Sequence, residues 1–466
     1  MRGVFTNSAG ILVSRVAGFI RDFTTASILG AGVYSDIFIV AFKLPNLFRS
    51  VFAEGAFTQA FLPSFAAARY KGAFSVRVFF GLFCVVLFIS ALASFFSEAL
   101  TQAIAWGFDE RTVKIAAPYV AVNFWYLDIV FLFSFLTALL HYRKSFVAPA
   151  FSTALLNVSM IFALLLAPIE RKDVVLWYLT FGVLIGGVLQ LLLHIVALKG
   201  KRLIPMLIGG VRKKREIKAD TNRFRRAFMP AVFGSSAVHI SAFIDTVLAS
   251  FFAAGSISYL FYANRIFQLP LAIFAIAFSM ALFPAIAKAV KRRDEEGSLK
   301  LLTKCFWLLL FLLSLSALGG ALLSEGIIWL LFERKEFARI DTIRCAEILT
   351  LYMIGLIPFG LSRLFSLWFY SHHAQALAAK ISAISLGCNA IFSLLLIAPL
   401  GVKGLALSGS LGGAVLLALN IRHFGWQRVL GMIRLKLVVA LLVALAFEAL
   451  AIEGFKLAVG YQGFFE

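Results

Sequence analysis

The sequence has few charged residues, which make up only 14% of its 466 positions. A soluble protein of this length uses roughly 25% charged residues to cover its surface. Hydrophobic residues account for 61% of the chain, phenylalanine fills 50 positions, and the mean hydropathy is +0.94. This composition excludes an ordinary soluble domain and indicates a protein whose natural solvent is lipid.

Cysteine is scarce as well, and none of the four cysteines is spaced to form a Cys-x-x-Cys pair. The six histidines are scattered, and only His372 and His373 are adjacent. We therefore expect no metal site and interpret the cysteines as small buried hydrophobic residues. They are Cys84, Cys305, Cys345 and Cys388.

Motifs for covalent chemistry are missing too. The sequence contains no Gly-x-Ser-x-Gly elbow, no nucleotide-binding P-loop and no paired-aspartate motif of a prenyl-diphosphate transferase. We expect a protein that is not an enzyme and has no cofactor, so its energy must come from an ion gradient, the membrane potential or the substrate's own gradient. Residues 1–10 also lack a signal-peptide pattern, so we expect the first helix to belong to the mature chain.

Long apolar segments recur along the whole chain. A helix needs about 20 apolar residues to cross the hydrocarbon core of a bilayer. The pattern predicts an all-α polytopic membrane protein with thirteen spans, near residues 5–29, 34–66, 75–105, 113–140, 145–168, 174–198, 226–253, 257–290, 300–332, 342–370, 374–398, 402–421 and 433–452.

Basic residues concentrate in alternate loops, although the net charge of +21 would elsewhere suggest a nucleic-acid partner. Segment 199–226 alone holds eleven Lys or Arg residues and only two acidic ones. The other set of loops is poorer in Lys and Arg, and its loop 333–344, with four, fits least well. The positive-inside rule then predicts that the N-terminus is cytoplasmic and that the basic loops face anionic lipids.

Two parts of the chain carry a similar pattern of prolines. Residues 41–48 (AFKLPNLF) and 60–66 (AFLPSFA) are similar to residues 264–271 (NRIFQLPL) and 281–287 (ALFPAIA). Six predicted helices separate the two copies, so both halves enter the membrane from the same side as parallel repeats. The alternative is that prolines recur by chance in long membrane helices.

The repeat predicts two six-helix lobes around a central cavity, with one further helix. We expect an N-lobe at 1–198, a basic cytoplasmic linker at 199–225, a C-lobe at 226–422, and a C-terminal segment at 423–466 that holds the last helix.

Several arginines lie deep in predicted spans, where a charged side chain costs a few kcal/mol. At ~1.5 Å per residue, Arg15 lies ~15 Å, Arg49 ~22 Å and Arg265 ~12 Å into its span. Positive charges exceed negative ones in this set: Arg15, Arg21, Lys43, Arg49 and Arg265 against Asp22, Asp36 and Glu54. Arginine matches phosphate oxygens and stays charged, so the set predicts a cationic cavity for a phosphate or diphosphate. The alternative is that each arginine pairs with a nearby carboxylate for structure alone.

Two further polar residues are candidates for binding a coupling cation. Asp245, followed by Thr246, lies in the seventh predicted span, and Asn389 lies in the eleventh. The alternative is that both only form hydrogen bonds between helices.

The sequence resembles the MurJ (MviN) family of lipid II flippases. The resemblance covers essentially the whole chain and is strongest in residues 10–72. It rests on residues 14–22 (SRVAGFIRD), Asp36, 42–49 (FKLPNLFR), 52–57 (FAEGAF), 59–63 (QAFLP) and 262–270 (YANRIFQLP).

The resemblance implies an exporter of the MOP superfamily that carries the undecaprenyl-diphosphate-linked peptidoglycan precursor from the inner to the outer leaflet of the bacterial cytoplasmic membrane. Its implied role is in peptidoglycan synthesis, cell-wall biogenesis and cell shape. The implied partners are lipid II, membrane lipids and cell-wall synthesis proteins, with no nucleic acid, and we expect a monomer. The implied substrate-binding residues are Arg15, Arg21, Arg49, Arg265, Asp36 and Glu54.

The sequence departs from the family pattern in two places. The family usually has fourteen helices, whereas thirteen fit here and residues 453–466 are too short for another. Some members also bind Na⁺ through an Asp matching Asp245, an Asn matching Asn389 and a second Asp, where this chain has Ser393. This departure weakens the expectation of a Na⁺ site and favours coupling to the membrane potential.

Three other functions compete with this interpretation. A multidrug or polysaccharide-lipid exporter of the same superfamily predicts fewer arginines in the cavity. A membrane glycosyltransferase needs a long outer loop with an acidic pair, and no predicted outer loop is long enough. A scaffold for the cell-wall machinery leaves the membrane-embedded arginines without a purpose.

Overall fold

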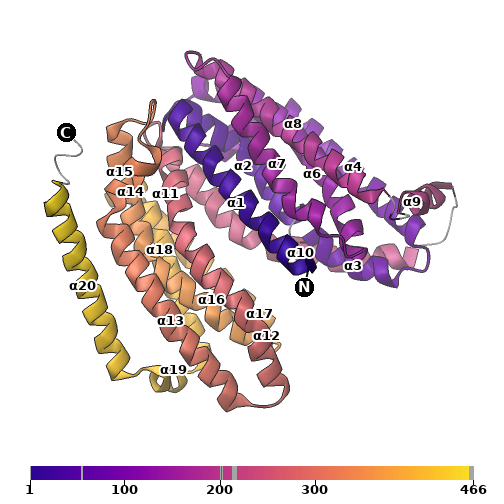
Figure 1. Ribbon diagram of the computed structural model, residues 1–466. Helices are drawn as coiled ribbons and strands as arrows, with labels where there is room; N and C mark the ends of the chain where they lie inside the picture. The colour runs from indigo at the N-terminus through magenta and orange to yellow at the C-terminus, as the bar shows by residue number, and fades with distance from the viewer. Residues whose placement is uncertain (1, 54–55, 200, 202, 213–217, 461–466) are drawn as a thin grey trace. The chain divides into compact units, whose positions relative to one another are not determined.

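The computed structural model describes residues 2–53, 56–199, 201, 203–212 and 218–460. Every regular element in these ranges is a helix, and none is a strand (Figure 1). The sequence-based prediction of an all-α fold is therefore confirmed.

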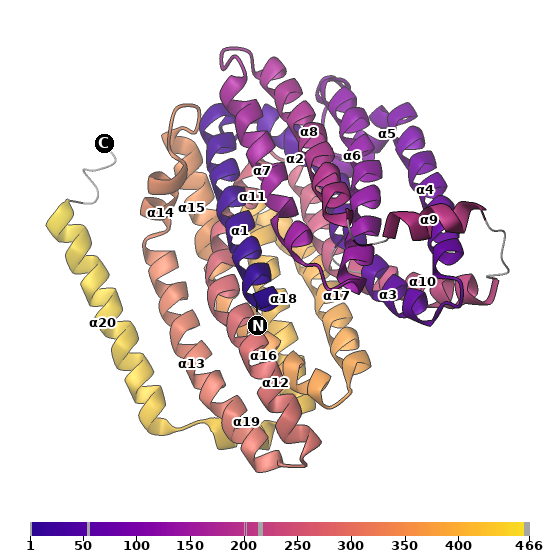
Figure 2. The same cartoon turned by 45° about the vertical axis from the view of Figure 1, so that its right-hand side comes forward.

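The helices follow one another with short connections, as Figure 2 also shows. In chain order they are α1 (Arg2–Leu29), α2 (Val33–Ala53), α3 (Ala56–Ala67), α4 (Lys71–Phe95), α5 (Ser97–Ile104), α6 (Glu110–Tyr142), α7 (Val147–Leu166), α8 (Lys172–Leu198), α9 (Leu203–Arg212), α10 (Lys218–Ala249), α11 (Ser256–Pro270), the π-helical segment η1 (Leu271–Ile276), α12 (Ala277–Lys291), α13 (Glu295–Leu322), α14 (Ser324–Phe332), α15 (Arg339–Ile354), α16 (Leu356–Ser371), α17 (Gln375–Leu400), α18 (Val402–Phe424), α19 (Trp426–Met432) and α20 (Leu435–Val459).

Each of the thirteen predicted spans contains a helix or a series of consecutive helices. Within the described ranges, nine segments are both long and apolar enough to cross a bilayer. The predicted spans outside these nine are α1, α2 with α3, α10, and α11 with α12. These four carry prolines or the polar residues of the predicted site, which lower their apolar character.

Two spans predicted as single helices differ from the prediction. The span at 257–290 is not one regular α-helix, because α11 ends at Pro270 and η1 follows before α12 begins. Proline has no N–H to donate, and a π-helical turn is one way in which a helix adapts to the lost hydrogen bond. In the matching repeat, α2 contains Pro45, and the described helix resumes as α3 with Pro63.

Two compact units make up the chain. Unit 1 comprises Met1–Gly255 and Arg334–Phe337, and unit 2 comprises Ser256–Glu333 and Ala338–Glu466. α10 packs against α3 and α2 within unit 1, and the predicted linker at 199–225 contains α9 and the start of α10. The lobe limits expected from the sequence remain a prediction.

Phenylalanine rings form a large part of the core of unit 1. Phe57, Phe61 and Phe65 on one face of α3 are fully buried. The Phe57 and Phe61 ring centroids are 5.1 Å apart, and Phe61 lies 5.6 Å from Phe135 of α6 and 6.3 Å from Phe224 of α10. Stacked and edge-to-face rings at these separations add to the apolar packing, so this cluster joins α3 to α6 and α10.

A buried polar network joins α6, α7 and α8 in the same unit. Tyr126 Oη donates to Gln190 Oε1 at 3.1 Å, and Gln190 Nε2 donates to the Ser152 carbonyl at 3.0 Å. Thr137 Oγ1 and His194 Nε2 are 2.8 Å apart. Polar side chains inside a membrane bundle must find partners within the protein, and these contacts fix the helices that support α1.

Unit 2 is built around close pairs of helices with small residues at their contacts. A Cβ atom added to Gly404 of α18 would lie 2.3 Å from the Leu396 carbonyl of α17. The last helix, α20, packs against α13 and has no buried residue (Figure 2). Leu315, Gly319, Phe447 and Phe455 help to line a groove of about 630 Å³ between α13 and α20. α20 is therefore a helix whose remaining surface is suited to lipid.

Candidate functional site in the membrane helices

The first helix approaches α7 through small residues spaced four apart. A Cβ atom on Gly10 would lie 2.6 Å from the Ala150 Cβ, and Ser14 Oγ donates to the Ala150 carbonyl at 3.3 Å. Gly18 continues the same face opposite Asn157. Small residues at this spacing allow membrane helices to approach closely, and the contact sets the rotation of α1.

Arg21 is held by two partners on this interface. Its side chain is buried, and Nε and Nη2 lie 3.0 and 2.5 Å from Asp22 Oδ1. Nη1 donates to Asn157 Oδ1 at 3.0 Å, and Asn157 Nδ2 donates to the Ser14 carbonyl at 3.1 Å. Arg21 is thus a fixed, partly neutralised cation, and its role in substrate binding remains a prediction.

Asn157 was not among the predicted site residues. It is the only side-chain amide in the apolar segment 147–166, and this isolation could have indicated a functional residue from the sequence. Its partner could not be identified from the sequence, because the two residues lie 136 positions apart.

Arg15 has a different environment on the same helix. It follows Ser14 directly, so its side chain leaves the helix about 100° away from the face that contacts α7. Its side chain is exposed, and it lies six residues, or about 9 Å along the axis, from Arg21. α1 therefore presents one accessible arginine and one fixed arginine.

Arg49 lies near the end of α2, one turn after Pro45. Its side chain is half-buried, and Nε donates to Asn46 Oδ1 at 3.1 Å. Lys43 is half-buried on the same helix. Glu54, a predicted site residue, lies outside the described residues.

Asp36 is buried at the start of α2. Its Oδ2 accepts a hydrogen bond of 2.7 Å from the backbone N–H of Gly255. Gly255 has a φ of +94°, in the region that favours glycine. The carboxylate therefore stabilises the turn between α10 and α11, and its predicted role in substrate binding remains a prediction.

Arg265 belongs to unit 2, on α11. It is half-buried, and its guanidinium carbon lies 4.9 Å from the centre of the Phe261 ring, a cation–π distance. Pro270 and η1 follow one turn later on the same helix. The other three predicted arginines belong to unit 1.

The two residues predicted to bind a cation lie in different units. Asp245 is half-buried on α10 of unit 1, and Asn389 is buried on α17 of unit 2 against Gly412. Ser393 Oγ lies 2.7 Å from Ser408 Oγ and joins α17 to α18. Among the described residues, no three His, Cys, Asp or Glu side chains are placed to hold a metal ion together.

A further arginine within a span was not among the predicted site residues. Arg363 lies on α16, inside the span Arg339–Ser371, and its side chain is exposed. Among the described residues no carboxylate lies within ion-pair distance of it. Its position within the predicted span 342–370 could have marked it as a candidate site residue.

Comparisons with known proteins agree on one family. Residues 25–464 match the family model described as lipid II flippase MurJ. A protein described as a probable lipid II flippase MurJ from Helicobacter pylori (strain ATCC 700392 / 26695) is 49% identical over 446 residues, which are 92% of this chain and 96% of that protein. One with the same description from Haemophilus influenzae (strain ATCC 51907 / DSM 11121 / KW20 / Rd) is 31% identical over 428 residues, covering 87% of this chain and 82% of the relative.

Solved structures show the same fold. A lipid II flippase MurJ in an inward closed conformation superposes with a TM-score of 0.81 at 22% identity and covers 99% of both chains. An inward-facing multidrug resistance MATE family transporter of the MOP superfamily gives a TM-score of 0.66 at 14% identity, covering 92% of this chain and 94% of that one. The two likenesses indicate the same architecture.

Proposed function

This chain belongs to the MurJ family of lipid II flippases, and we propose that it transports lipid II with its membrane-embedded arginines as the site for the diphosphate. The family, the fold and the transporter class predicted from the sequence are confirmed. The protein is a multi-pass membrane protein and a flippase, not an enzyme. The residues that bind the cargo are the subject of the proposal.

The observation that carries the proposal is the arrangement of the two arginines on α1. Arg21 is fixed by Asp22 and Asn157, whereas Arg15 remains accessible about 9 Å away. A fixed guanidinium provides a pre-organised charge, and an accessible one can form two parallel hydrogen bonds to phosphate oxygens. We assign Arg15 to direct contact with the diphosphate and Arg21 to the surrounding positive potential.

Arg49 on α2 of unit 1 and Arg265 on α11 of unit 2 are further residues that we propose for binding the diphosphate. Both are half-buried, and each is supported by a neighbour on its own helix, Asn46 and Phe261 respectively. Arg363 joins this set because its exposed guanidinium also lies within a span. Asp36 and Glu54 remain proposed members whose carboxylates would limit the excess of positive charge.

The candidate cation-binding residues bear on the energy source, and the basic loops bear on the orientation in the membrane. Na⁺ coupling through Asp245 and Asn389 is the weaker option, since Ser393 bonds to Ser408 where a second carboxylate would be needed. We propose that the membrane potential drives the step. The protein would act as a monomer in the bacterial cytoplasmic membrane, with its N-terminus on the cytoplasmic side. Its basic loops would then contact anionic lipids and the cell-wall synthesis proteins.

A multidrug exporter of the same superfamily is the second candidate, because the MATE transporter shares the fold. The two functions require opposite charges in the residues that bind the cargo. A diphosphate cargo requires the arginines, whereas an organic cation would be repelled by them. Loss of function on neutralising these residues would favour the flippase.

The test is complementation in cells depleted of this protein, with lipid II accessibility measured at the outer leaflet. We expect Arg15→Ala, Arg49→Ala and Arg265→Ala each to reduce accessible lipid II strongly, whereas Arg111→Ala, at an exposed site near the start of α6, leaves it unchanged. Membrane levels of each variant serve as the control. Normal complementation by all three variants would contradict the proposed site.

A further inference from the structure

A carboxylate with no role in the proposed transport site lies near the middle of α6. Asp128 is eighteen residues after the first residue of this 33-residue helix and fourteen before the last. At ~1.5 Å per residue it lies ~27 and ~21 Å from the helix ends, near the centre of the bilayer. Its side chain is more than nine-tenths buried, with 7% of the residue exposed.

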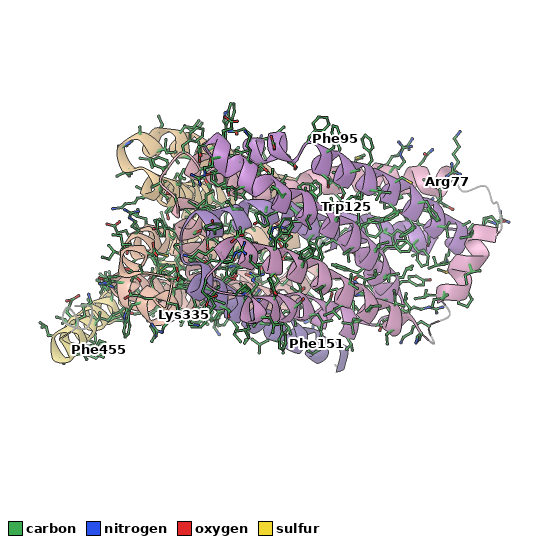
Figure 3. All side chains as sticks on the ribbon, turned by 90° about the horizontal axis from the view of Figure 1, so that it is seen from above. Arg77, Phe95, Trp125, Phe151, Lys335 and Phe455 are labelled. Carbon is green, nitrogen blue, oxygen red and sulfur yellow. The ribbon has the colours of Figure 1, made fainter. Side chains whose placement is uncertain are left out.

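The residues of α6 on either side of Asp128 are mostly apolar. Neither carboxylate oxygen has a hydrogen-bond partner among the described residues. Ser90 of α4 is its polar neighbour, but Ser90 Oγ donates to the Phe124 carbonyl at 3.3 Å, one turn earlier on α6. Trp125, labelled in Figure 3, lies one turn earlier on α6 and is partly exposed.

No cation among the described residues forms an ion pair with this carboxylate. α6 packs against α2, α3, α4, α5 and α8, and none of their described Lys, Arg or His side chains lies within 4 Å of the Asp128 oxygens. Lys71, Lys172 and Asp173 stand at the first turns of their helices. The remaining charged or titratable groups on these helices are Tyr34, Asp36, Lys43 and Arg49 of α2, Arg77 and Cys84 of α4, Glu98 of α5, and Tyr178 and His194 of α8; α3 carries none.

Two of these groups form hydrogen bonds with other residues. The Asp36 carboxylate binds the Gly255 N–H. His194 binds Thr137, nine residues or ~13 Å along α6 from Asp128. An ionised carboxylate buried without a counter-charge or hydrogen bonds costs far more than a neutral one, and such a group takes up a proton instead.

We propose that Asp128 is a proton-binding site, and that its neutral carboxyl is the form in which α4 packs on α6 at mid-membrane. One carboxylate oxygen takes a proton from a hydronium ion, so that one O–H bond forms on the carboxyl, one O–H bond of the hydronium breaks and a water molecule is released. The new O–H can donate to the Phe124 carbonyl or to Ser90 Oγ, both of which lie beside it. Ionisation at alkaline pH would then weaken the contact between α4 and α6.

A proton fits this site better than a metal cation. Hard cations need several oxygen ligands in their coordination shell. The Ser90 hydroxyl near the carboxyl already bonds to the Phe124 carbonyl, and neither carboxylate oxygen has a hydrogen-bond partner among the described residues. The inference does not depend on the cargo, so it can fail or hold independently of the proposed transport.

The test uses infrared spectroscopy on the full-length protein in lipid vesicles at pH 7. The wild type should show the carbonyl-stretch band of a protonated carboxylic acid, and the band should shift in D₂O. Asp128→Asn, which keeps the shape of the neutral acid, should remove this band. Asp109→Asn, which changes the exposed N-cap residue of the same helix, should leave it unchanged.

Glu448→Gln provides a second comparison, because Glu448 Oε2 of α20 is also buried without a hydrogen-bond partner among the described residues. A band lost only in Glu448→Gln, or no band at all, would overturn the proposal. An increase in thermal stability with NaCl but not with choline chloride, in the absence of the band, would assign a Na⁺ site instead and would also overturn it.

Thermal unfolding gives an independent measurement. The melting temperature of the wild type should fall as the pH rises from 7 to 10, and that of Asp128→Asn should fall by at least about 2 °C less. Equal falls in both proteins would overturn the proposal. If Asp128→Asn does not fold, the D₂O-sensitive band of the wild type decides: a band still present in Glu448→Gln supports the proposal, and its absence overturns it.

Discussion

At the scale of single residues, the membrane-embedded arginines were visible in the sequence but their partners were not. Depth along a helix follows from counting residues, so Arg15, Arg49 and Arg265 could be chosen without a structure. The Arg21–Asn157 bond joins residues 136 positions apart, and no pattern within either helix indicates it. The binding of Asp36 to the Gly255 backbone could not be predicted for the same reason.

Replacing Asn157 by alanine removes a hydrogen-bond acceptor from Arg21 and a donor to the Ser14 carbonyl. Leaving these buried groups without partners should cost about 1–3 kcal/mol. We expect a lower melting temperature for Asn157→Ala in lipid or detergent. Val158→Ala, at the exposed neighbouring position, is the control and should change it little.

Gly30 joins α1 to α2 with a φ of +70°. A Cβ atom there would lie 2.4 Å from the Glu336 carbonyl, so Gly30→Ala combines backbone strain with a clash and should destabilise unit 1 by about 1–3 kcal/mol. Gly32→Ala, which meets nothing within 4 Å, should be nearly neutral. Equal melting temperatures of the two variants would contradict the described turn.

At the scale of helices, the number and order of the spans were predictable because apolar length is a strong local signal. The interruptions within the spans could not be predicted. The break before Leu271 depends on how the backbone around Pro270 satisfies its hydrogen bonds, which proline alone does not determine. The short α9 was also missed, because segment 199–225 was interpreted by its charge and the apolar residues of α9 contribute nothing to that signal.

The contact between α9 and α4 depends on two glycines. A Cβ atom on Gly210 would lie 2.3 Å from the Gly72 carbonyl carbon, whereas Gly209 meets nothing within 4 Å. We expect Gly210→Ala to loosen α9 from α4 and to increase protease cleavage within 199–217. Gly209→Ala should be cleaved at the wild-type rate, and equal cleavage of both variants would exclude this contact.

At the scale of the whole molecule, the fold and the family followed from the sequence because the motifs in residues 10–72 and 262–270 are long and specific. The two compact units divide at Gly255, and the lobe limits expected from the sequence remain a prediction. α10 packs on α3 of unit 1 through Phe224 and Phe228, contacts that charge and hydropathy patterns do not encode.

The central claim is that this protein moves lipid II across the bilayer by means of its arginines. The most direct measurement is the rate at which lipid II crosses vesicle membranes containing the purified protein, with a membrane potential imposed. We predict rapid crossing with the wild type and with Arg111→Ala, and a rate reduced at least about tenfold with Arg15→Ala, corresponding to about 1.4 kcal/mol of lost stabilisation. Crossing at the same rate in protein-free vesicles and with the wild type, or an unchanged rate with Arg15→Ala, would contradict the account.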